Sequence, residues 1–521
     1  MEEVPEIVLG IDLGTTNSCV SIWENDKVIV IPNKNGAFTT PSMVSFSKKD
    51  ITVGDVAKNN IDKNYENTIY GVKRLIGRNF NDKEVQEDIK YFPFTTEKDK
   101  ETGKPTFKVL YKQKTTNFFP EDISGFVLEE MKNIAKSYLN KEITEAVITV
   151  PAYFNDLQRK ATQAAALKAG LNVRRMINEP TAAALAYRLD KKLKNDQNVL
   201  VFDLGGRTFD VTVLNISETL LDIKSSRGDM HLGGDDFDNE LVQYCLNNLK
   251  EQGKDYSNNK KVLIQLKKEC EKAKINLSNQ YETTIFMDHI GLNVTILRAE
   301  FEDLCQKYFT KIIEILGIAL EDANLTKEKI NEIVLVGGST RIPKIQEILK
   351  EYFGKVTYKY ENTILDVDKI VSMGAAIQGA ITEGVEEGGL EKILLLDVTP
   401  FTLGVELRDG SMDPLIKRNT KIPTEKTQPY KAVGNNVKVN IYQGEDNIAK
   451  NNQLLGSINI EPGIVKINFF IDLNGVLSVS VVDKKGNEKQ LTIDLSYYLA
   501  QWKKLEFIFK NILTKFYSFF Y

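Results

Sequence analysis

The sequence predicts an α/β protein with a duplicated, two-lobed domain, followed by an antiparallel β-sandwich and a short C-terminal helix. Two observations favour the α/β part. Short aliphatic runs alternate with helical stretches over about 385 residues, and one glycine-containing turn motif occurs twice. The β part follows from the pattern after residue 389, where apolar and polar residues alternate with a period of two.

The strands of the α/β part are predicted from runs of β-branched and aliphatic residues. They cover residues 7–11, 147–150, 199–202 and 333–336. Helical spacing between the strands predicts a helix over residues 156–169, with Asn155 as its N-cap and Gly170 as its stop. A second helix is predicted to open at Ser124.

The repeated motif organises this part of the chain. GIDLGTTN at residues 10–17 is echoed by FDLGGRTFD at residues 202–210, and each copy lies between two apolar runs. Two copies of strand, turn and strand predict two similar halves that face each other across a cleft.

Each turn is suited to hold an anion. Glycine lets backbone N–H groups converge on a phosphate, and threonine hydroxyls add donors. The two candidate nests are Gly14, Thr15, Thr16 and Asn17, and Gly205, Gly206 and Thr208. Asp12 and Asp203 end the preceding strands, where carboxylates can hold Mg²⁺ through its water shell. One such turn alone would be weak, but the duplicated pair favours a nucleotide clamped between the halves.

Composition excludes several other classes of function. With 68 basic and 72 acidic residues, the net charge of −4 gives no global basis for nucleic acid or an anionic membrane as a partner. Zinc and Ser-His centres need imidazoles or clustered thiols, and the chain has only two histidines. Its dispersed cysteines are predicted to be buried free thiols: Cys19, Cys245, Cys270 and Cys305. Neither a signal peptide nor a membrane span is expected.

The β part begins after a Glu-Gly-rich stretch at residues 383–389. The next segment, LEKILLLD at residues 390–397, is apolar and short, which is typical of a linker. Alternating segments such as 437–442 and 476–482 predict an antiparallel β domain to about residue 494. Residues 495–521 combine aromatic residues with four lysines and predict an amphipathic helix.

Eight motifs in order resemble the heat shock protein 70 family, the seventy-kilodalton heat-shock chaperones, from about residue 7 to about residue 494. They are IDLGTTNSCV (11–20), YGVKRLIGR (70–78), VPAYFNDLQRKAT (150–162), NEPTAAALAY (178–187), FDLGGRTFDV (202–211), HLGGDDFDN (231–239), LVGGSTRIPKIQ (335–346) and LLLDVTPFTLGVE (394–406). The resemblance implies an actin-like ATPase domain over residues 1–389, with a lobe boundary near residue 190. It further implies a linker at 390–397 and a peptide-binding β-sandwich at 398–494.

The resemblance also implies roles for single residues. The implied catalytic residues are Lys73, Glu179, Asp203 and Asp210. Mg²⁺ would be oriented by Asp12, Asp203 and Glu179. Phosphate contacts would come from Gly14, Thr15, Thr16, Asn17, Gly205, Gly206 and Thr208. The adenosine would lie against Glu271, Lys274, Ser278, Gly337, Gly338, Ser339 and Arg341, and an extended peptide against Val405, Tyr430 and Val437.

The implied function is that of an ATP-dependent chaperone, an ATPase whose cycle controls exchange of unfolded or nascent polypeptides. ATP or ADP and Mg²⁺ are the implied cofactors, with K⁺ as a further candidate. J-domain co-chaperones and nucleotide-exchange factors are the implied partners, and the cytoplasm is the default compartment. Two other classes stay open: a sugar or glycerol kinase with the same duplicated turns, and a nucleotide-binding scaffold or co-chaperone with weak or no hydrolysis.

Four departures from the family pattern lead to expectations. Arg207 replaces a glycine, so an arginine there is strained or obstructs approach to the phosphate, or else its guanidinium reaches the phosphates. Slower hydrolysis with retained binding is expected. Ile275 replaces an arginine over the adenine, which predicts weaker ATP affinity. Arg408 and a short loop after Tyr430 alter the arch over the peptide. Only 27 residues follow residue 494, where the family has a helical lid, so faster peptide exchange is expected.

Overall fold

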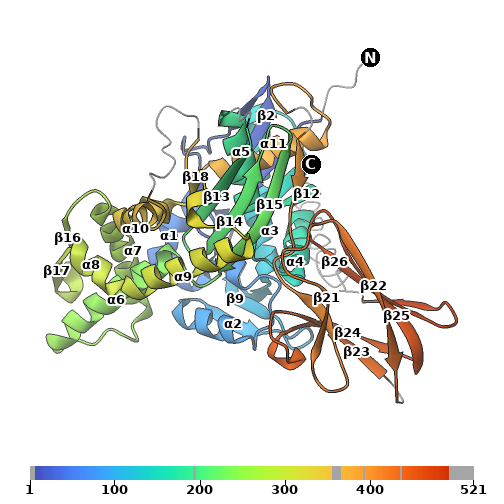
Figure 1. Ribbon diagram of the computed structural model, residues 1–521. Coiled ribbons are helices and arrows are strands. Elements are labelled where there is room, and N and C mark those ends of the chain that lie inside the picture. The colour runs from blue at the N-terminus through green and yellow to red at the C-terminus, as the bar shows by residue number, and fades with distance from the viewer. Residues whose placement is uncertain (1–5, 192–194, 355–364, 391–392, 435–436, 492–521) are drawn as a thin grey trace, which may run out of the picture.

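The computed structural model describes residues 6–191, 195–354, 365–390, 393–434 and 437–491. Its N-terminal lobe, lobe I, is built on a sheet in the order β12-β11-β1-β2-β3, with β4 paired to β2 (Figure 1). The strands are β1 (Leu9–Asp12), β2 (Asn17–Glu24), β3 (Lys27–Val30), β4 (Thr40–Pro41), β11 (Glu145–Val150) and β12 (Asn172–Asn178). Strand β1 is parallel to β11 and antiparallel to β2.

The second lobe, lobe II, has a central sheet in the order β18-β13-β14-β15-β19. Its strands are β13 (Gln197–Leu204), β14 (Phe209–Ile216), β15 (Leu220–Asp229), β18 (Glu332–Val336) and β19 (Leu394–Leu396). Strand β13 is parallel to β18 and antiparallel to β14, as β1 is to β11 and β2. The repeated motif thus forms equivalent antiparallel turns in two similar sheets, which confirms the predicted duplicated α/β fold.

Helices α5 (Glu179–Lys191) and α11 (Ile370–Thr382) pack between the two sheets. One apolar cluster contains residues of both helices, Val147 of β11, and Val199 and Val201 of β13. Helix α11 lies so close to β1 that a Cβ on Gly10 would be 2.1 Å from the backbone nitrogen of Ala376. Glycine at this position therefore permits the helix–sheet contact that holds lobe I against lobe II.

The outer face of the lobe I sheet is covered by α3 (Pro120–Leu139) and α4 (Asp156–Lys168). The prediction for α4 is confirmed: the Asn155 side chain accepts the Gln158 N–H, and Gly170 beyond its end has φ +68°. Helix α3 begins at Pro120, four residues before the predicted start. Proline is favoured at a first helical position, and the Asp122 carboxylate accepts the Phe119 N–H at 2.7 Å.

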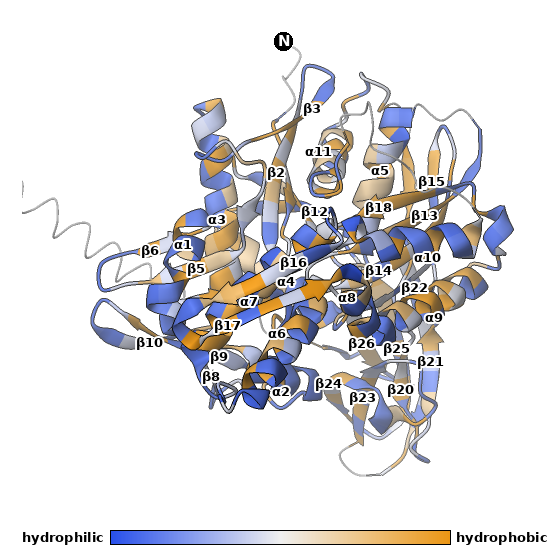
Figure 2. Ribbon diagram, turned by 90° about the vertical axis from the view of Figure 1, so that its left-hand side faces the viewer, coloured by the Kyte–Doolittle hydropathy of each residue, from blue (hydrophilic) through white to orange (hydrophobic). Residues whose placement is uncertain are grey.

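Further elements extend both lobes around the cleft. Lobe I adds β5 (Met43–Phe46), β6 (Ile51–Val53), α1 (Asp55–Asn64), β7 (Thr68–Tyr70), α2 (Lys83–Asp88), β8 (Thr95–Lys98), β9 (Pro105–Tyr111) and β10 (Lys114–Phe118). Lobe II adds α6 (Gly234–Glu251), α7 (Lys260–Leu277), β16 (Glu282–Met287), β17 (Leu292–Leu297), α8 (Arg298–Leu304), α9 (Gln306–Asp322) and α10 (Pro343–Phe353). Helices α9 and α10 mix polar and apolar residues, as expected of helices with one face on a core (Figure 2). All four cysteines are free and buried, as predicted.

The β domain consists of two four-stranded antiparallel sheets, which confirms that prediction. One has the order β21-β20-β23-β24 and the other β22-β25-β26-β27. The strands are β20 (Leu403–Glu406), β21 (Met412–Ile416), β22 (Thr424–Ala432), β23 (Val437–Gln443), β24 (Gln453–Ile460), β25 (Gly463–Ile471), β26 (Leu477–Asp483) and β27 (Glu488–Gln490). Inward-facing residues of both sheets form one core. The helix expected in the tail at 495–521 lies outside the described residues.

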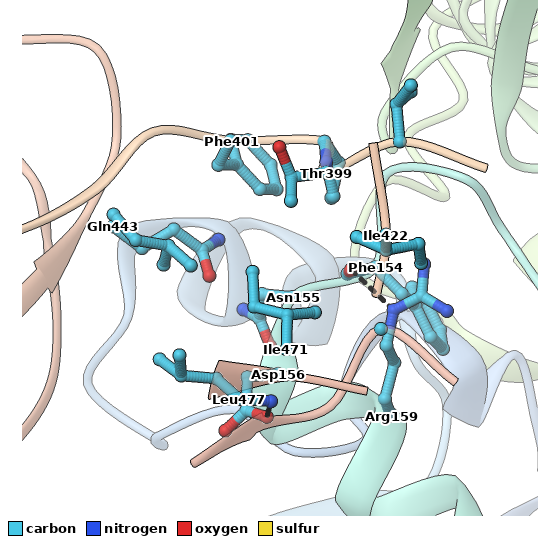
Figure 3. A pocket seen from close by; sticks show the side chains of 14 residues that line it. Phe154, Asn155, Asp156, Arg159, Thr399, Phe401, Ile422, Gln443, Ile471 and Leu477 are labelled. Carbon is cyan, nitrogen blue, oxygen red and sulfur yellow. Dashed lines mark hydrogen bonds between the residues drawn. The ribbon is translucent and has the colours of Figure 1, made fainter. Parts of the chain in front are cut away.

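The linker and the β domain contact both lobes. Strand β19 of the linker pairs in parallel with β15 of lobe II. Asp397 accepts hydrogen bonds from Asn178 at 2.9 Å and Thr181 at 3.2 Å in lobe I. On α4, Asp156 accepts the Leu477 N–H at 2.7 Å, beside a cavity of about 30 Å³ between lobe I and the β domain (Figure 3). The linker is thus held by both lobes at once.

Candidate active site

The predicted phosphate loops meet at a cavity of about 110 Å³ between the lobes. Loop 1 joins β1 to β2 and loop 2 joins β13 to β14. The predicted site residues that line the cavity are Asp12, Gly14, Thr15, Thr16, Asn17, Lys73, Glu179, Asp203, Gly205, Gly206, Thr208, Gly337 and Gly338. Residues far apart in the sequence are therefore brought to one place by the two equivalent turns.

The backbone carbonyls of both loops are held by neighbouring donors. The Ser42 hydroxyl donates to the Gly14 carbonyl at 2.7 Å, and the Ser339 hydroxyl donates to the Gly205 carbonyl at 2.8 Å. The loops also touch, because a Cβ on Gly206 would lie 2.2 Å from Thr16 Oγ1. That hydroxyl oxygen is buried, and no described residue is its hydrogen-bond partner. Thr16 thus leaves a donor for a ligand in the cavity.

A buried lysine is placed among the acidic residues of the cavity. Lys73 follows β7, is 6% exposed, and donates to the Leu13 carbonyl at 2.6 Å and to the Glu179 carboxylate. Glu179 begins α5, while Asp12 is the last residue of β1 and Asp203 the last but one of β13. One ammonium is therefore shared among several carboxylates, and the site has an excess of buried negative charge.

The burial and the excess of negative charge raise the pKa values of the aspartates at the site. Burial, together with the Glu179 carboxylate, raises the pKa of Asp12 to about 7. Burial first, then Glu179 and the neighbouring aspartates, raises the pKa of Asp203 well above its usual value, and burial raises that of Asp210 likewise. Such groups favour a cation among them, because a positive charge restores their ionised forms.

The donor set fits Mg²⁺ held with phosphate. The side chains of Asp12, Glu179 and Asp203 offer hard oxygen atoms. Asp210, predicted as a catalytic residue, does not line the cavity, and its Oδ1 is buried with no hydrogen-bond partner among the described residues. Within those same residues, no group of three or more His, Cys, Asp or Glu side chains is close enough to hold an ion directly. A magnesium ion here would therefore be bound through water and phosphate oxygens, as Mg²⁺ commonly is.

The predicted adenosine residues are only partly gathered at the cavity. Lys274 pairs with Asp238 at 2.8 Å and donates to the Gly234 carbonyl at 2.9 Å, which ties α7 to α6. Arg341 pairs with Asp368 at 2.7 Å, and Ser278 donates to the Lys274 carbonyl at 3.4 Å. Glu271 lines a second cavity of about 100 Å³ beside the first. Glycines 337 and 338 alone of this group line the phosphate cavity.

Some lining residues were missed from the sequence. They are Thr39, Val336, Val367, Asp368 and Val371. Asp368 stands just before α11, where an acidic residue is ordinary, so no local pattern distinguishes it. Thr39 lies in a loop, and the sequence pattern predicts that the valines are core residues. Only the folded arrangement assigns them to the cavity.

Both expectations for the Arg207 backbone and guanidinium are wrong. Its backbone lies outside the left-handed region, so no strain of that kind is present. Its side chain does not line the phosphate cavity but lines the second one, and its guanidinium pairs with Asp235 at 2.7 Å. Neither feature that was expected to slow hydrolysis at Arg207 is therefore present in the structure.

Comparison with known proteins agrees with this arrangement. The family model described as Hsp70 protein matches residues 8–510. A heat shock 70 kDa protein of Emericella nidulans is 45% identical over 504 residues, covering 93% of this chain and 77% of the relative. One from Neurospora crassa has the same identity and coverage, and heat shock cognate 70 kDa protein 3 of Dictyostelium discoideum is 43% identical over 495 residues, covering 91% of this chain and 78% of the relative. The chain belongs to the Hsp70 family.

The Hsp70 family is an ATPase family, and an ATP-dependent chaperone is the expected role of this member. Among the described helices, none is both long and apolar enough to cross a bilayer.

In this Hsp70 chain, the predicted peptide-contacting residues lie around the core of the β domain. Val405 is 2% exposed within that core, and Tyr430 and Val437 are partly buried against it. The Tyr430 hydroxyl donates to the Asp413 carboxylate at 2.7 Å. Arg408, which is predicted to stand in place of an arch residue, is exposed after β20.

Proposed function

We propose that this Hsp70 chain binds ATP with Mg²⁺ between its two phosphate loops and hydrolyses it. The cycle would control exchange of unfolded or nascent polypeptide in the β domain. The observation that supports this most is the single cavity that unites both loops, Lys73 and the carboxylates of Asp12, Glu179 and Asp203. Positioning and charge neutralisation are what phosphoryl transfer requires of a protein.

Each group has a role consistent with its place. Backbone N–H groups of the two loops and the Thr16 hydroxyl would bind phosphate oxygens. The Lys73 ammonium, fixed by the Leu13 carbonyl and Glu179, would neutralise charge on the transferred phosphoryl group. Asp210, with one buried oxygen unpartnered, would accept a hydrogen bond from the attacking water. When bound, Mg²⁺ would supply further charge neutralisation across the phosphates.

The linker offers a route from nucleotide to peptide. Strand β19 pairs with β15 of lobe II, while Asp397 just beyond it accepts hydrogen bonds from lobe I. Relative movement of the lobes would have to break one set of these contacts. Nucleotide-dependent lobe movement would therefore release or capture the linker, and shift the β domain between states of different peptide affinity. Val405, Tyr430 and Val437 are proposed to contact the peptide in the released state.

Several finer assignments are part of the proposal. J-domain co-chaperones and nucleotide-exchange factors are the proposed partners, K⁺ is a proposed further ion, and the cytoplasm is the proposed compartment. The kinase alternative would need a small-molecule acceptor, which the family membership does not favour. The scaffold alternative loses its support from Arg207, whose guanidinium lies outside the phosphate cavity.

Single-turnover hydrolysis of bound ATP tests the proposal. The hydrolysis of ATP in a preformed complex with the chain is followed with and without an unfolded model peptide, and with and without EDTA. Hydrolysis that needs Mg²⁺ and accelerates with peptide is expected. Tight ATP binding without phosphate release would favour the scaffold, and transfer to glucose or glycerol would favour the kinase.

A further inference from the structure

Arg207 belongs to loop 2 of lobe II, but its side chain contacts lobe I. It is 6% exposed, and its Cζ lies 5.6 Å from the Tyr70 ring centroid and 5.7 Å from the Phe92 ring centroid. Tyr70 ends β7, and Phe92 follows α2, so both rings belong to the lobe across the cleft. A guanidinium within about 6 Å of an aromatic ring is attracted by the ring. The lobes are therefore joined by this side chain.

The lobe I surface at this contact leaves room for the arginine at one glycine. Gly71 has φ +69°, and a Cβ there would lie 2.2 Å from Arg207 Nη1 and 2.5 Å from its Cζ. Any larger residue at position 71 would collide with the guanidinium. Gly71 therefore leaves room for the guanidinium, while its φ of +69° favours glycine there in any case.

The charge of the guanidinium is also compensated within the interface. Arg207 Nη2 lies 2.7 Å from Asp235 Oδ2, and Lys267 reaches the same carboxylate at 3.1 Å. Burial opposes ionisation of Asp235, but the charges of Arg207 and Lys267 outweigh it and hold the pKa of Asp235 well below its usual value. The contact is therefore a buried ion pair capped by two aromatic rings, and Lys267 remains as a partner if Arg207 is removed.

A second arginine crosses the interface in the opposite direction. Arg74 of lobe I donates to the backbone carbonyl of Arg207 at 2.5 Å and pairs with Asp88 at 3.0 Å. On the lobe II side, a Cβ on Gly233 would lie 2.5 Å from the Arg207 backbone nitrogen. Both the backbone and the side chain of Arg207 are therefore enclosed, and separating the lobes must withdraw the guanidinium from the rings and break the Arg74 hydrogen bond.

We propose that Arg207 and Asp235 of lobe II, with Tyr70, Gly71 and Phe92 of lobe I, form a latch that slows nucleotide release. The proposal rests on the proposed nucleotide site and goes beyond it by assigning Arg207 as a positioning residue. Because the guanidinium does not line the phosphate cavity, the latch acts on lobe opening and leaves the chemical step unchanged.

The test measures release and chemistry separately on the full chain. Release of fluorescently labelled ADP is followed by stopped flow after adding excess unlabelled ADP, for the parent, Arg207→Ala and Arg207→Lys. We expect release to be about 10- to 100-fold faster in Arg207→Ala and intermediate in Arg207→Lys, which keeps the charge but not the planar group. Single-turnover hydrolysis should stay within about twofold of the parent.

Two further variants separate the latch from a general loss of structure. Lys327→Ala removes a cation 5.2 Å from the Tyr352 ring centroid, inside lobe II, and should leave ADP release unchanged. Tyr70→Leu should speed release, and Tyr70→Leu combined with Arg207→Ala should be no faster than Arg207→Ala alone, since both break one contact.

The outcomes are distinguishable. ADP release from Arg207→Ala within about twofold of the parent would overturn the latch while leaving the proposed function intact. A tenfold or greater slowing of hydrolysis would overturn the assignment of Arg207 to release, since it would require a role at the phosphates. A parent chain that binds no labelled ADP would overturn both proposals.

Discussion

The two phosphate loops are equivalent in the sheets but differ at one position. Thr16 in loop 1 corresponds to Arg207 in loop 2, since each lies four residues after the motif aspartate, Asp12 or Asp203. The Thr16 hydroxyl is buried and has no described partner, and Thr16 lines both the phosphate cavity and the second cavity. The Arg207 guanidinium is partnered by Asp235 and lies against lobe I.

This difference shows that the backbone of the turn does not depend on which side chain stands at this position. The backbones of both loops keep their carbonyls occupied and converge on one cavity. A residue whose side chain leaves the cavity can therefore be exchanged without loss of the nest, which depends on backbone N–H groups. We therefore expect substitution of either paired aspartate to slow hydrolysis strongly, because the loops are alike there. Substitutions at positions 16 and 207, where the loops differ, should change different properties: ATP affinity at position 16 and ADP release at position 207.

The paired aspartates give the largest expected effect. Asp12→Asn and Asp203→Asn each remove a buried charge that would orient the hydrated Mg²⁺. Each should lower the single-turnover hydrolysis rate by about 10²- to 10³-fold, because charge stabilisation at the transferring phosphoryl group is lost. Asp409→Asn, at an exposed turn of the β domain, serves as the control and should be neutral. If only one of the two substitutions lowers the hydrolysis rate, the two loops are not functionally equivalent.

Thr16→Val sharpens the contrast between the loops. The change keeps the shape and removes the hydroxyl that no described residue satisfies. A hydrogen bond to a charged group contributes about 1.5 to 3 kcal/mol, so ATP affinity should fall by about 10- to 100-fold. Isothermal titration measures the affinity, and single-turnover hydrolysis should slow as well, unlike in Arg207→Ala. Unchanged affinity would mean that the hydroxyl faces no phosphate.

Much of the fold follows from local sequence. Strand patterns, the repeated turn and the Asn155 cap predict elements that the structure contains, because burial and capping depend on near neighbours. The start of α3 was misplaced, since helical periodicity gives less information about a boundary than Pro120 and Asp122 do. The convergence of Asp12, Lys73 and Asp203 follows from the duplicated motif together with the family resemblance.

The orientation of Arg207 could not be predicted in the same way. Its side chain is long enough to turn toward the phosphates or toward lobe I, and the choice is made by Asp235, Tyr70 and Gly71. Tyr70 and Gly71 belong to lobe I and become neighbours of Arg207 only after the lobes pack, whereas Asp235 comes from α6 of lobe II, whose backbone bonds to loop 2. Asp368 is similar, because its place in the cavity depends on where the chain returns to lobe I.

The lobes also differ in how they hold the β domain. On lobe I, Asp156 is buried, accepts the Leu477 N–H at 2.7 Å and pairs with Lys160 at 2.8 Å. Asp156→Ala would leave that N–H and Lys160 without this acceptor, at a cost of about 1 to 3 kcal/mol to docking. Amide hydrogen exchange at residues 394–396 should rise by about 5- to 100-fold, since β19 separates when the β domain undocks. Asp156→Asn, which keeps an acceptor for Leu477, should have a smaller effect.

On lobe II, Arg418 of the β domain pairs with Asp322 of α9 at 2.7 Å, with side chains 18% and 14% exposed, and a second contact is more exposed. Lys421 of the β domain pairs with Asp222 and donates to the Ile223 carbonyl on β15, but its side chain is 41% exposed. Exposed pairs contribute about 0.2 to 1 kcal/mol, so Lys421→Ala should raise exchange at residues 394–396 by no more than about fivefold. Added salt should remove the difference between Lys421→Ala and the parent, because screening weakens an exposed pair and hardly affects the buried Asp156 contact. An effect as large as that of Asp156→Ala, or one that salt leaves unchanged, would show that lobe II holds the β domain as firmly as lobe I does.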